Sequence, residues 1–477
     1  MNSISQIYKN ELKMRLENKI STLSSEMVDA IINSLANPTS NEKYFNFICD
    51  IQNSTREMVK TIIVETLEEI DFQFKNSSER IKKYVINKSN VSRTITTIFG
   101  EISFKRTYYK SRVNGKKYFY IDEVFNLPKY DHYDPVVKAL AIDKAVDNSQ
   151  ADAGRTIGER INPISSLLSD NRSLSHISRQ TIYNWLNEWV CPDYVYEQET
   201  NTPNSLYIMF DEKFIGCQDL NGDIMVKSMV CFEGVKSIGK GRRKLINRLI
   251  HHVYSSSPWD EFITVLSQKY DFKKVDNIYI LADGGKWIKA GINELKVEKH
   301  IAVKFLLCEF HFKQAINRIT TDPKLRKEIL TSFKEDKKKI FKDKVTKIIE
   351  ENRGNKENKT INLNYILNNY KHIKAMLESK IGSSMESHIS HYVASTFASR
   401  PKGFSSKNIK QYLKLNNYKN NELNIFKLYS LSYNKSEKIT INEKELNYQM
   451  FDIKKRIPVL ANGENTGTYK AIKSIIY

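Results

Sequence analysis

The sequence has few cysteines and no long apolar run, and both absences narrow the class of protein. Five cysteines are scattered through 477 residues without the spacing of a disulfide framework, so a reducing compartment is expected. The opening residues MNSISQIYKN lack the apolar segment of a secretory signal. No run approaches the roughly 20 apolar residues that cross a bilayer. We therefore expect a cytoplasmic protein that does not act at a membrane.

Motifs of several common enzyme classes are missing as well. The chain contains no Walker-type phosphate-binding loop, no dinucleotide-binding glycine fingerprint and no G-x-S-x-G turn. Nucleotide hydrolysis and serine chemistry therefore lack support, and no nucleotide cofactor is expected.

Acidic residues are in deficit along the whole chain. Lys and Arg number 75 against 55 Asp and Glu, which gives a net charge of +20. A polyanionic partner would explain this surplus, and nucleic acid is the commonest polyanion. A lysine-rich protein from an A+T-rich genome would show the same surplus, so charge alone leaves both explanations open.

Apolar periodicity divides the first part of the chain into two regions. Helical spacing in SEMVDAIINSL and REMVKTIIVETLEEIDFQF predicts a helical N-terminal region over 1–90. A segment rich in Thr, Ile, Phe and Tyr follows, and its Asn114-Gly115 pair favours a hairpin turn. A small antiparallel β module is therefore predicted over 91–130.

The next region, 131–196, has the pattern of a helix-turn-helix. DPVVKALAIDKAV begins with an Asp cap, and SHISRQTIYNWLNEWV predicts a helix that starts near Ser178. A polar outer face and an apolar inner face suit a recognition helix, although any amphipathic surface helix has the same pattern. The expected DNA-facing residues are Arg179, Gln180 and Asn184, and the expected inward residues are Ile182, Trp185 and Leu186.

Beyond a polar linker the pattern becomes α/β. Three successive strand candidates between 205 and 255 precede a helix, a strand, a helix, a strand and a further helix. Three meandering strands followed by this alternation match the strand order of the ribonuclease-H-like fold. We therefore predict a multidomain α+β protein in which a ribonuclease-H-like α/β core is interrupted by a helical insertion. The predicted bounds are 203–320 and 381–420 for the core, 321–380 for the insertion and 421–477 for a C-terminal segment.

Two aspartates lie at strand ends in this predicted core. Asp211 is near the end of the first strand and Asp283 ends the fourth, and those strands are neighbours in such a sheet. A divalent cation would relieve the repulsion between the two carboxylates, and hard oxygen ligands suit Mg²⁺, for which Mn²⁺ is expected to substitute. Strand-end Asp residues are usually turn formers, so only their joint position indicates a metal site. Glu386 is the expected third ligand, with Glu212, Glu309 and Glu378 as rivals.

A second arrangement of metal-binding residue types is present. Cys308-x-x-His311 and His388-x-x-His391 together could form a zinc site. One thiolate with three imidazoles is an uncommon ligand set. The two histidines spaced three apart are also consistent with a helix face near phosphate.

Seven segments carry a resemblance to one family. They are TIFGEISFKRTYY, SRQTIYNWL, YIMFDEKF, ILADGGKWIK, CEFHFKQAI, ESHISHYVASTFASRPKGFS and IPVLANGENTGTYKAIKSI, and they occur in family order over about residues 90 to 477. The chain thus resembles the ISLre-type bacterial insertion-sequence transposases, relatives of the Mutator-like DDE transposases. It departs from the family where Ser387 stands for a usual Gly and Phe404 for a usual Trp. Neither departure removes a carboxylate.

The resemblance implies a ribonuclease-H-like core with its acidic triad on Asp211, Asp283 and Glu386. It also implies that Cys308 and His311 form the family's C-x-x-H element, which counts against a zinc site. The implied activity is DNA transposition on double-stranded element ends and target DNA, by a homodimer or higher oligomer. A non-mobile nuclease of the same fold, a DNA-binding regulator without chemistry and a structural protein are the alternatives.

Basic and aromatic residues near the triad are expected to contact DNA. Trp287 is expected either to pack beneath the site or to stack on a base, and packing is favoured. The expected DNA-contacting residues of this region are Arg242, Arg243, Lys286, Trp287, Lys289, His311, Lys313, His388 and Arg400.

Overall fold

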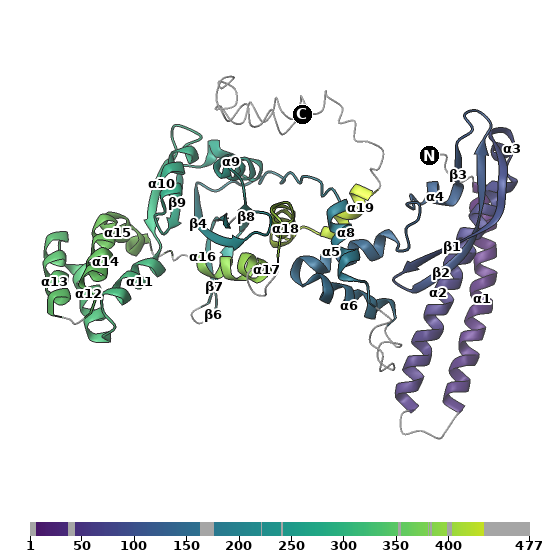
Figure 1. Ribbon diagram of the computed structural model, residues 1–477, viewed down its shortest axis with the longest axis horizontal. Coiled ribbons are helices and arrows are strands. Elements are labelled where there is room, and N and C mark those ends of the chain that lie inside the picture. The colour runs from purple at the N-terminus through teal and green to yellow at the C-terminus, as the bar shows by residue number, and fades with distance from the viewer. Residues whose placement is uncertain are drawn as a thin grey trace. The chain divides into compact units, whose positions relative to one another are not determined.

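The chain forms two compact units, each with its own sheet (Figure 1). The first consists of the described residues up to Pro192 with those from Asn424 to Tyr433, and the second of the described residues from Asp193 to Leu423. The computed structural model describes residues 6–36, 43–162, 176–220, 222–239, 242–351, 354–379, 381, 384–397 and 403–433.

Two long helices and a three-stranded sheet make up one part of the first unit. α1 packs along α2, and α2 packs on the central strand of a sheet with the order β1-β2-β3. Both strand pairs are antiparallel. Leu67 of α2 joins Ile102 and Phe104 of β2 in the core between them. The bounds are α1 (Gln6–Ala36), α2 (Lys43–Asn76), α3 (Ser78–Lys83), β1 (Tyr84–Thr97), β2 (Gly100–Ser111), β3 (Lys117–Phe119) and α4 (Tyr120–Val124).

The sheet of this unit begins earlier than the sequence pattern predicts. The hairpin at Asn114-Gly115 is confirmed, since β2 pairs with β3 and Gly115 has a φ of +69°. The prediction of helix up to residue 90 is wrong at its end, because β1 begins at Tyr84, which pairs with Ser111. Two register shifts interrupt the alternation of β1 in this part, so its sequence lacks the period of two that marks a strand.

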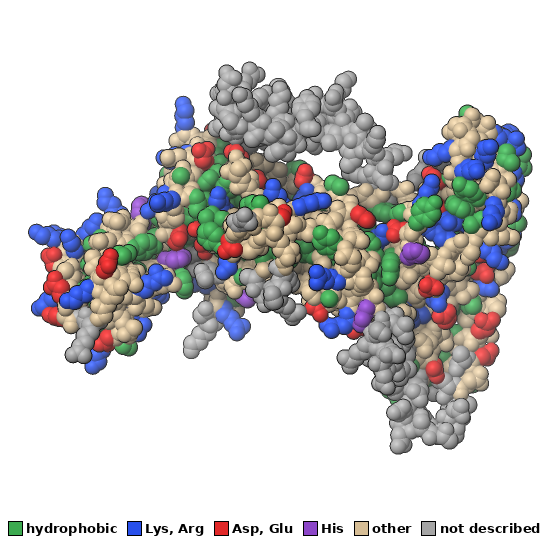
Figure 2. All heavy atoms as spheres, viewed as in Figure 1, with side chains coloured by type: hydrophobic (Ala, Val, Ile, Leu, Met, Phe, Trp, Pro, Cys, Tyr) green, Lys and Arg blue, Asp and Glu red, His purple; other side chains and the backbone are tan. Residues whose placement is uncertain are grey.

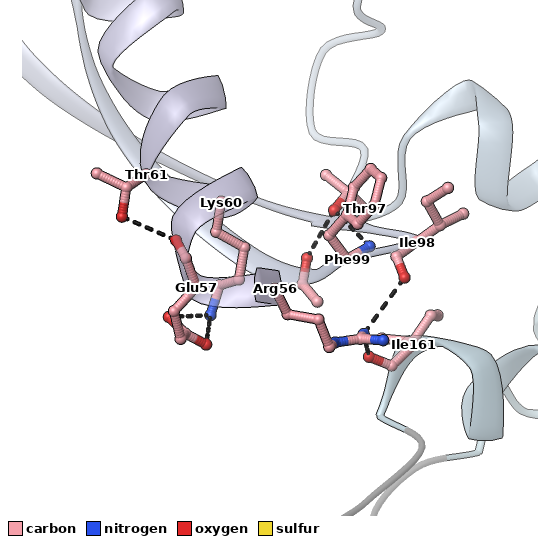
Figure 3. A network of polar contacts seen from close by, with 9 residues as sticks. Arg56, Glu57, Lys60, Thr61, Thr97, Ile98, Phe99 and Ile161 are labelled. Atoms are coloured by element: carbon pink, nitrogen blue, oxygen red, sulfur yellow. Dashed lines mark hydrogen bonds and ion pairs between the residues drawn. The ribbon is translucent and has the colours of Figure 1, made fainter. Parts of the chain in front are cut away.

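Arg56 of α2 links the parts of the first unit. Its guanidinium donates to the carbonyls of Arg160 and Ile161 at the end of α6 (Gln150–Ile161), and to that of Ile98 between β1 and β2 (Figure 3). The last carbonyls of a helix have no partner within the helix, so a cation satisfies them and complements the helix dipole. One side chain therefore joins the long helices, the sheet and the helices that follow.

Those following helices form the region predicted as helix-turn-helix. Asp134 caps the first of them by accepting from the Val137 N–H, and Ser178 caps α8, so both predicted helix starts are confirmed. α6 packs on α8 so closely that a Cβ on Gly154 would lie 2.0 Å from the Ile177 carbonyl oxygen. α5 also contacts α19. The remaining bounds are α5 (Pro135–Asp147), α8 (Arg179–Glu188) and α19 (Ile425–Tyr433).

A five-stranded sheet of order β10-β9-β4-β5-β8 forms the centre of the second unit. β4, β5 and β8 are antiparallel, whereas β9 and β10 run parallel to β4 on its other side. The first strand of the sheet is therefore central, with the meander on one side and the later strands on the other. The bounds are β4 (Ser205–Gly216), β5 (Asp223–Phe232), β8 (Leu249–Val253), β9 (Asn277–Ala282) and β10 (Ala302–Leu307).

Helices cover both faces of this sheet. Leu206, Ile208 and Phe210 of β4 pack in a core with α9 and α10, whereas Met209 packs in a second core with α11 to α16. This alternation is the period of two expected of a strand buried on both sides. The bounds are α9 (Pro258–Lys269), η1 (Phe272–Lys274), α10 (Lys286–Gly291), η2 (Ile292–Leu295), α11 (Glu309–Ile319), α16 (Met385–His388), the π-helix η3 (Ile389–Ala394) and α17 (Ser395–Phe397).

The predicted helical insertion folds around the second of these cores. Its apolar side chains, including Phe333, Phe341 and Ile366, belong to the cluster that holds Met209. Among the described helices, none combines the length and apolar character needed to span a bilayer. The bounds are α12 (Pro323–Glu335), α13 (Lys338–Glu351), α14 (Lys356–Asn368) and α15 (Tyr370–Ser379).

Residues 244–255, predicted as one strand, belong to two. β7 (Arg242–Ile246) pairs with β6 (Gly234–Gly239) in a separate two-stranded sheet, and β8 begins at Leu249. Asn247 lies between them with a φ of +47°, which ends the extended backbone. The prediction of a single strand is therefore wrong, because a left-handed residue divides it.

The edge strand β8 is covered by α18 (Ser406–Asn420). The amide of Asn417 accepts from the His252 N–H and donates to its carbonyl, at 2.7 and 2.8 Å. Asn421, one turn later, does the same for Ile250 at 2.8 and 2.7 Å. Two side-chain amides thus replace the missing neighbouring strand, and they block an edge that could otherwise pair with another chain.

Candidate active site

Asp211 lies in the middle of β4, which continues to Gly216, so the prediction that it lies near the end of the first strand is wrong. Asp283 directly follows the end of β9 at Ala282, as predicted. β4 and β9 pair from Ser205 with Asn277 to Met209 with Leu281, at a constant offset. If the same offset is continued two residues past the last pair, Asp211 of β4 is set opposite Asp283, which follows the end of β9. Because alternate residues share a face of a sheet, Asp211 belongs to the face of Met209.

Backbone N–H groups orient both carboxylates. The Glu212 N–H donates to Asp211 Oδ1 at 2.9 Å, and the Gly285 N–H donates to Asp283 Oδ1 at 2.8 Å. Gly284 has a φ of +88°, so the turn after β9 uses the conformation that glycine adopts most readily. These bonds place one oxygen of each carboxylate against the main chain.

The helix that carries Glu386 lies on the Met209 face of β4. The Ser384 N–H lies 3.3 Å from Met209 Sδ, and Met385 and Ile389 belong to the Met209 cluster. The Glu386 side chain is outside the described residues, but its helix is on the side of the sheet to which Asp211 belongs. The predicted helix over 383–405 is α16, a π-helical turn and α17, and it is described up to Phe397. A π-helical turn often accompanies a functional site.

A row of polar side chains continues from Asp211 across the antiparallel strands. Asp211 is the register partner of Ser228, and Ser228 is the register partner of His252. Ser228 and His252 are 0% and 1% exposed, and the Ser228 Oγ lies 2.8 Å from His252 Nδ1. Burial, with smaller contributions from His251 and His388, lowers the pKa of His252 to about 3, so its ring is neutral.

The protonated ring nitrogen of His252 follows from its surroundings. Nε2 is buried and has no hydrogen-bond partner among the described residues. An unpaired buried N–H is rarer than an unpaired acceptor, so we infer that Nδ1 carries the hydrogen and donates to Ser228. The Ser228 hydroxyl oxygen then accepts from His252, and its own hydrogen remains available to donate. Ser228 lies in the same cross-strand row as Asp211 and on the same face of the sheet.

The opposite face of β4 holds a different carboxylate. Trp287 Nε1 donates to Glu212 at 2.6 Å, and the Trp287 ring packs against Phe210 and Trp259 with centroids 6.0 and 5.8 Å apart. Lys227 lies 5.4 Å from the Trp287 ring centre. Trp287 is therefore packed in the core beneath the site, as the sequence interpretation favoured, and Glu212 is bound there with it.

Cys308 and His311 form a pair at the start of α11. Burial raises the pKa of the Cys308 thiol. Hydrogen bonds and charge from His311 together lower it by more than burial raises it, so the resulting pKa is below its ordinary value. His388 stacks on Tyr392 at 5.5 Å, and burial lowers its pKa to about 4. Across the described residues, no three His, Cys, Asp or Glu side chains are placed to hold a metal ion together. The zinc arrangement with His391 is therefore not assembled.

The helical insertion contacts the candidate site directly. The Tyr365 hydroxyl of α14 donates to the Asp283 carbonyl at 2.9 Å, and Lys289 Nζ lies 3.4 Å from Asn369 Oδ1. Burial, followed by the charges of Asp283 and Cys308, raises the pKa of Tyr365, so it remains a neutral donor. Sequence reasoning missed Tyr365, Ser228 and His252, because only the register and the folded insertion bring them to the aspartates.

The predicted DNA-contacting residues of the second unit lie on several elements. The exposed cations among them are Arg242, Arg243, Lys286, Lys289 and Lys313. Lys313 forms an ion pair with Glu309 at 2.7 Å. Arg400 lies outside the described residues. Arg242 and Arg243 are on β7, Lys286 and Lys289 on α10 directly after Asp283, and Lys313 on α11.

In the first unit, α8 presents the predicted polar face. Arg179, Gln180 and Asn184 are exposed, and Gln180 donates to Asn184 at 2.9 Å. Ile182, Trp185 and Leu186 are buried, as predicted.

Comparison with known proteins places the chain in a family. A profile described as an uncharacterised protein family, UPF0236, matches residues 43–427. A UPF0236 protein of Caldanaerobacter subterraneus subsp. tengcongensis is 28% identical over 386 residues, 78% of either chain. A second from that organism is 26% identical over 456 residues, 90% of this chain and 91% of the relative. A UPF0236 protein of Streptococcus gallolyticus is 26% identical over 58% of this chain and 60% of its own length. The chain therefore belongs to the UPF0236 family.

Proposed function

We propose that this protein is a DNA transposase of the DDE type, built on a ribonuclease-H-like core. The observation that carries the proposal is the parallel pairing of β4 with β9, whose register continued by two residues would set Asp211 opposite Asp283, with the Glu386 helix on the Asp211 side of the sheet. The sheet order, in which the first strand lies between the meander and the later parallel pair, supports the fold assignment. The net charge of +20 supports a nucleic-acid partner.

The donor set fits Mg²⁺. Asp211, Asp283 and Glu386 would offer only carboxylate oxygens, which are the ligands that hard divalent cations prefer. Each aspartate is already oriented by a backbone N–H, which reduces the freedom lost on binding. Bound Mg²⁺ would lower the pKa of a water or a DNA 3′-hydroxyl and stabilise the leaving oxygen in an in-line phosphoryl transfer.

The chain's own residues would supply positioning and charge. Lys286 and Lys289 follow Asp283 on α10 and are exposed, and they would contact the DNA phosphates. Tyr365 holds the Asp283 main chain, and Trp287 fills the core under β4. No covalent protein intermediate is required, because water and then a DNA 3′-end would be the successive nucleophiles. The exposed polar face of α8 would read the element's ends, with a homodimer or larger assembly holding two of them.

The names of the relatives add an independent line of support. One relative's name joins eleven locus names from a single organism, and another joins four. Proteins encoded many times in one genome are what a self-copying element produces. A nuclease or regulator that serves the cell has no such need for copies.

Strand cleavage and joining on DNA carrying the sequences that flank this gene would test the proposal. With Mg²⁺, we expect nicking at inverted repeats and transfer of the resulting 3′-ends to a second duplex. Asp211→Asn and Asp283→Asn should abolish both reactions. The matched control is Asp276→Asn, because Asp276 is exposed at the opposite end of β9.

The result also separates the alternatives. Cleavage without joining would favour a non-mobile nuclease, and DNA binding without cleavage would favour a regulator. Full cleavage by Asp283→Asn would overturn the site itself.

A further inference from the structure

A strongly basic two-stranded ribbon lies outside the main sheet of the second unit. It consists of β6 and β7, residues 234–239 and 242–246, and is called the basic ribbon below. It contains no Asp or Glu. In Figure 2, Lys and Arg side chains project at the place that β6 and β7 occupy in Figure 1. Its four cations are Lys236, Arg242, Arg243 and Lys244.

The base of the ribbon is anchored, whereas its outer part is in solvent. Val235 and Leu245 face one another and pack against the core cluster that holds Met209. The Glu233 N–H donates to the Ile246 carbonyl at 3.0 Å. Every described residue between these anchors is exposed, including Ile238 at 57%. An isolated hairpin is marginal in water, so the anchored base is what holds this ribbon in place.

The cations of the ribbon repel one another. Lys236 lies directly opposite Lys244, and like charges at such positions destabilise a strand pair. Ser237 lies opposite Arg243, so this Arg points to the other face. Positive charge therefore occupies both faces of a narrow, projecting element, an arrangement that a polyanion on both sides would stabilise.

We propose that the basic ribbon enters the major groove of duplex DNA. This inference rests on the proposed function for its choice of DNA as the polyanion. The major groove is about 12 Å wide and admits a two-stranded ribbon, whereas the minor groove is only about 6 Å wide and carries a more degenerate base pattern. Cations on both faces then meet the phosphates of both walls. Arg242 and Ile238 near the tip can contact base edges, where Arg pairs with guanine and an apolar side chain meets a thymine methyl.

The test is duplex binding in Ca²⁺ over a range of salt concentrations, measured by fluorescence anisotropy. The variant carries Lys236→Gln, Arg242→Gln, Arg243→Gln and Lys244→Gln together. Each lost phosphate contact reduces the slope of log affinity against log salt by about 0.9, so we expect a slope shallower by about 3 and at least about tenfold weaker binding. The matched control removes four exposed lysines of α12 and α13 by Lys324→Gln, Lys327→Gln, Lys339→Gln and Lys342→Gln. It should keep the slope within about 1 of wild type.

Groove placement has its own readout. Dimethyl sulfate methylates guanine N7, which faces the major groove, so wild type should protect guanines that the ribbon variant leaves reactive. A ribbon variant that binds and protects like wild type would overturn the inference while the transposase proposal stands. Equal weakening in both variants, or stronger wild-type binding to poly-glutamate than to duplex, would also overturn it. Failure of the wild-type chain to bind duplex would remove both proposals.

Discussion

Replacing Asp283 with Asn should stabilise the metal-free protein and remove its response to metal. The register of β4 with β9, continued by two residues, sets Asp211 opposite Asp283, and adjacent strands lie about 4.8 Å apart. Two negative charges at that separation repel by about 1–3 kcal/mol for effective dielectric constants of about 20 to 80. Both side chains are partly exposed, so the lower value applies. Asp283→Asn should therefore raise the local stability of β4 and β9 by about 1 kcal/mol.

Bound metal should make the wild type more stable than Asp283→Asn, the reverse of the metal-free case. At 100 times the dissociation constant, bound Mn²⁺ stabilises the wild-type fold by about 2.7 kcal/mol, whereas the variant gains little. The variant should then be the less stable protein by about 1.7 kcal/mol, the difference between these two estimates. Native-state hydrogen exchange of the β4 and β9 amides measures this locally, which avoids treating two units as one transition. Asp276→Asn should leave both values at wild type, and an Asp283→Asn protein that Mn²⁺ still protects would refute the reasoning.

Three further predictions concern other parts of the chain. Asn421→Ala should cost about 2–4 kcal/mol, because the Ile250 N–H and carbonyl lose their partners; unchanged exchange of β8 amides would contradict this. The folded pKa of His252, about 3, is below its unfolded value, so its contribution is complete above about pH 6.5 and is lost as pH falls toward 3. His252→Phe should therefore flatten the acid limb of a stability–pH curve. Arg179→Ala should weaken binding to element ends by about 1–3 kcal/mol more than to random duplex, and equal losses would make it a phosphate contact.

Local pattern predicted most elements, and the differences have physical causes. The caps Asp134 and Ser178 and the turn at Gly115 were predictable because each depends on a few adjacent residues. The start of β1 was not, because its polar residues become a strand only by pairing with β2. The split before β8 depends on the left-handed conformation of Asn247, for which the residue type gives only a preference.

The candidate site divides in the same way. Asp211 and Asp283 could be selected from sequence, because each directly follows an apolar strand pattern. Ser228 and His252 could not, since their relation to Asp211 is a cross-strand register between segments without local signal. Tyr365 lies in a charged helical segment, and nothing in its sequence indicates that α14 reaches the end of β9.

The position of the helical insertion would allow the chain to support the proposed site of mutually repelling carboxylates. Between Asp283 and Glu386 the chain forms α12 to α15, whose core is continuous with the core beneath Met209 and the Glu386 helix. Tyr365 holds the Asp283 main chain from that core. The insertion separates Asp283 from Glu386 in sequence. In the fold it contacts the Asp283 turn and shares a core with the Glu386 helix. A shift of the insertion would move the Asp283 turn and α16 together, so the surface of the insertion can influence the site without contributing a ligand to it.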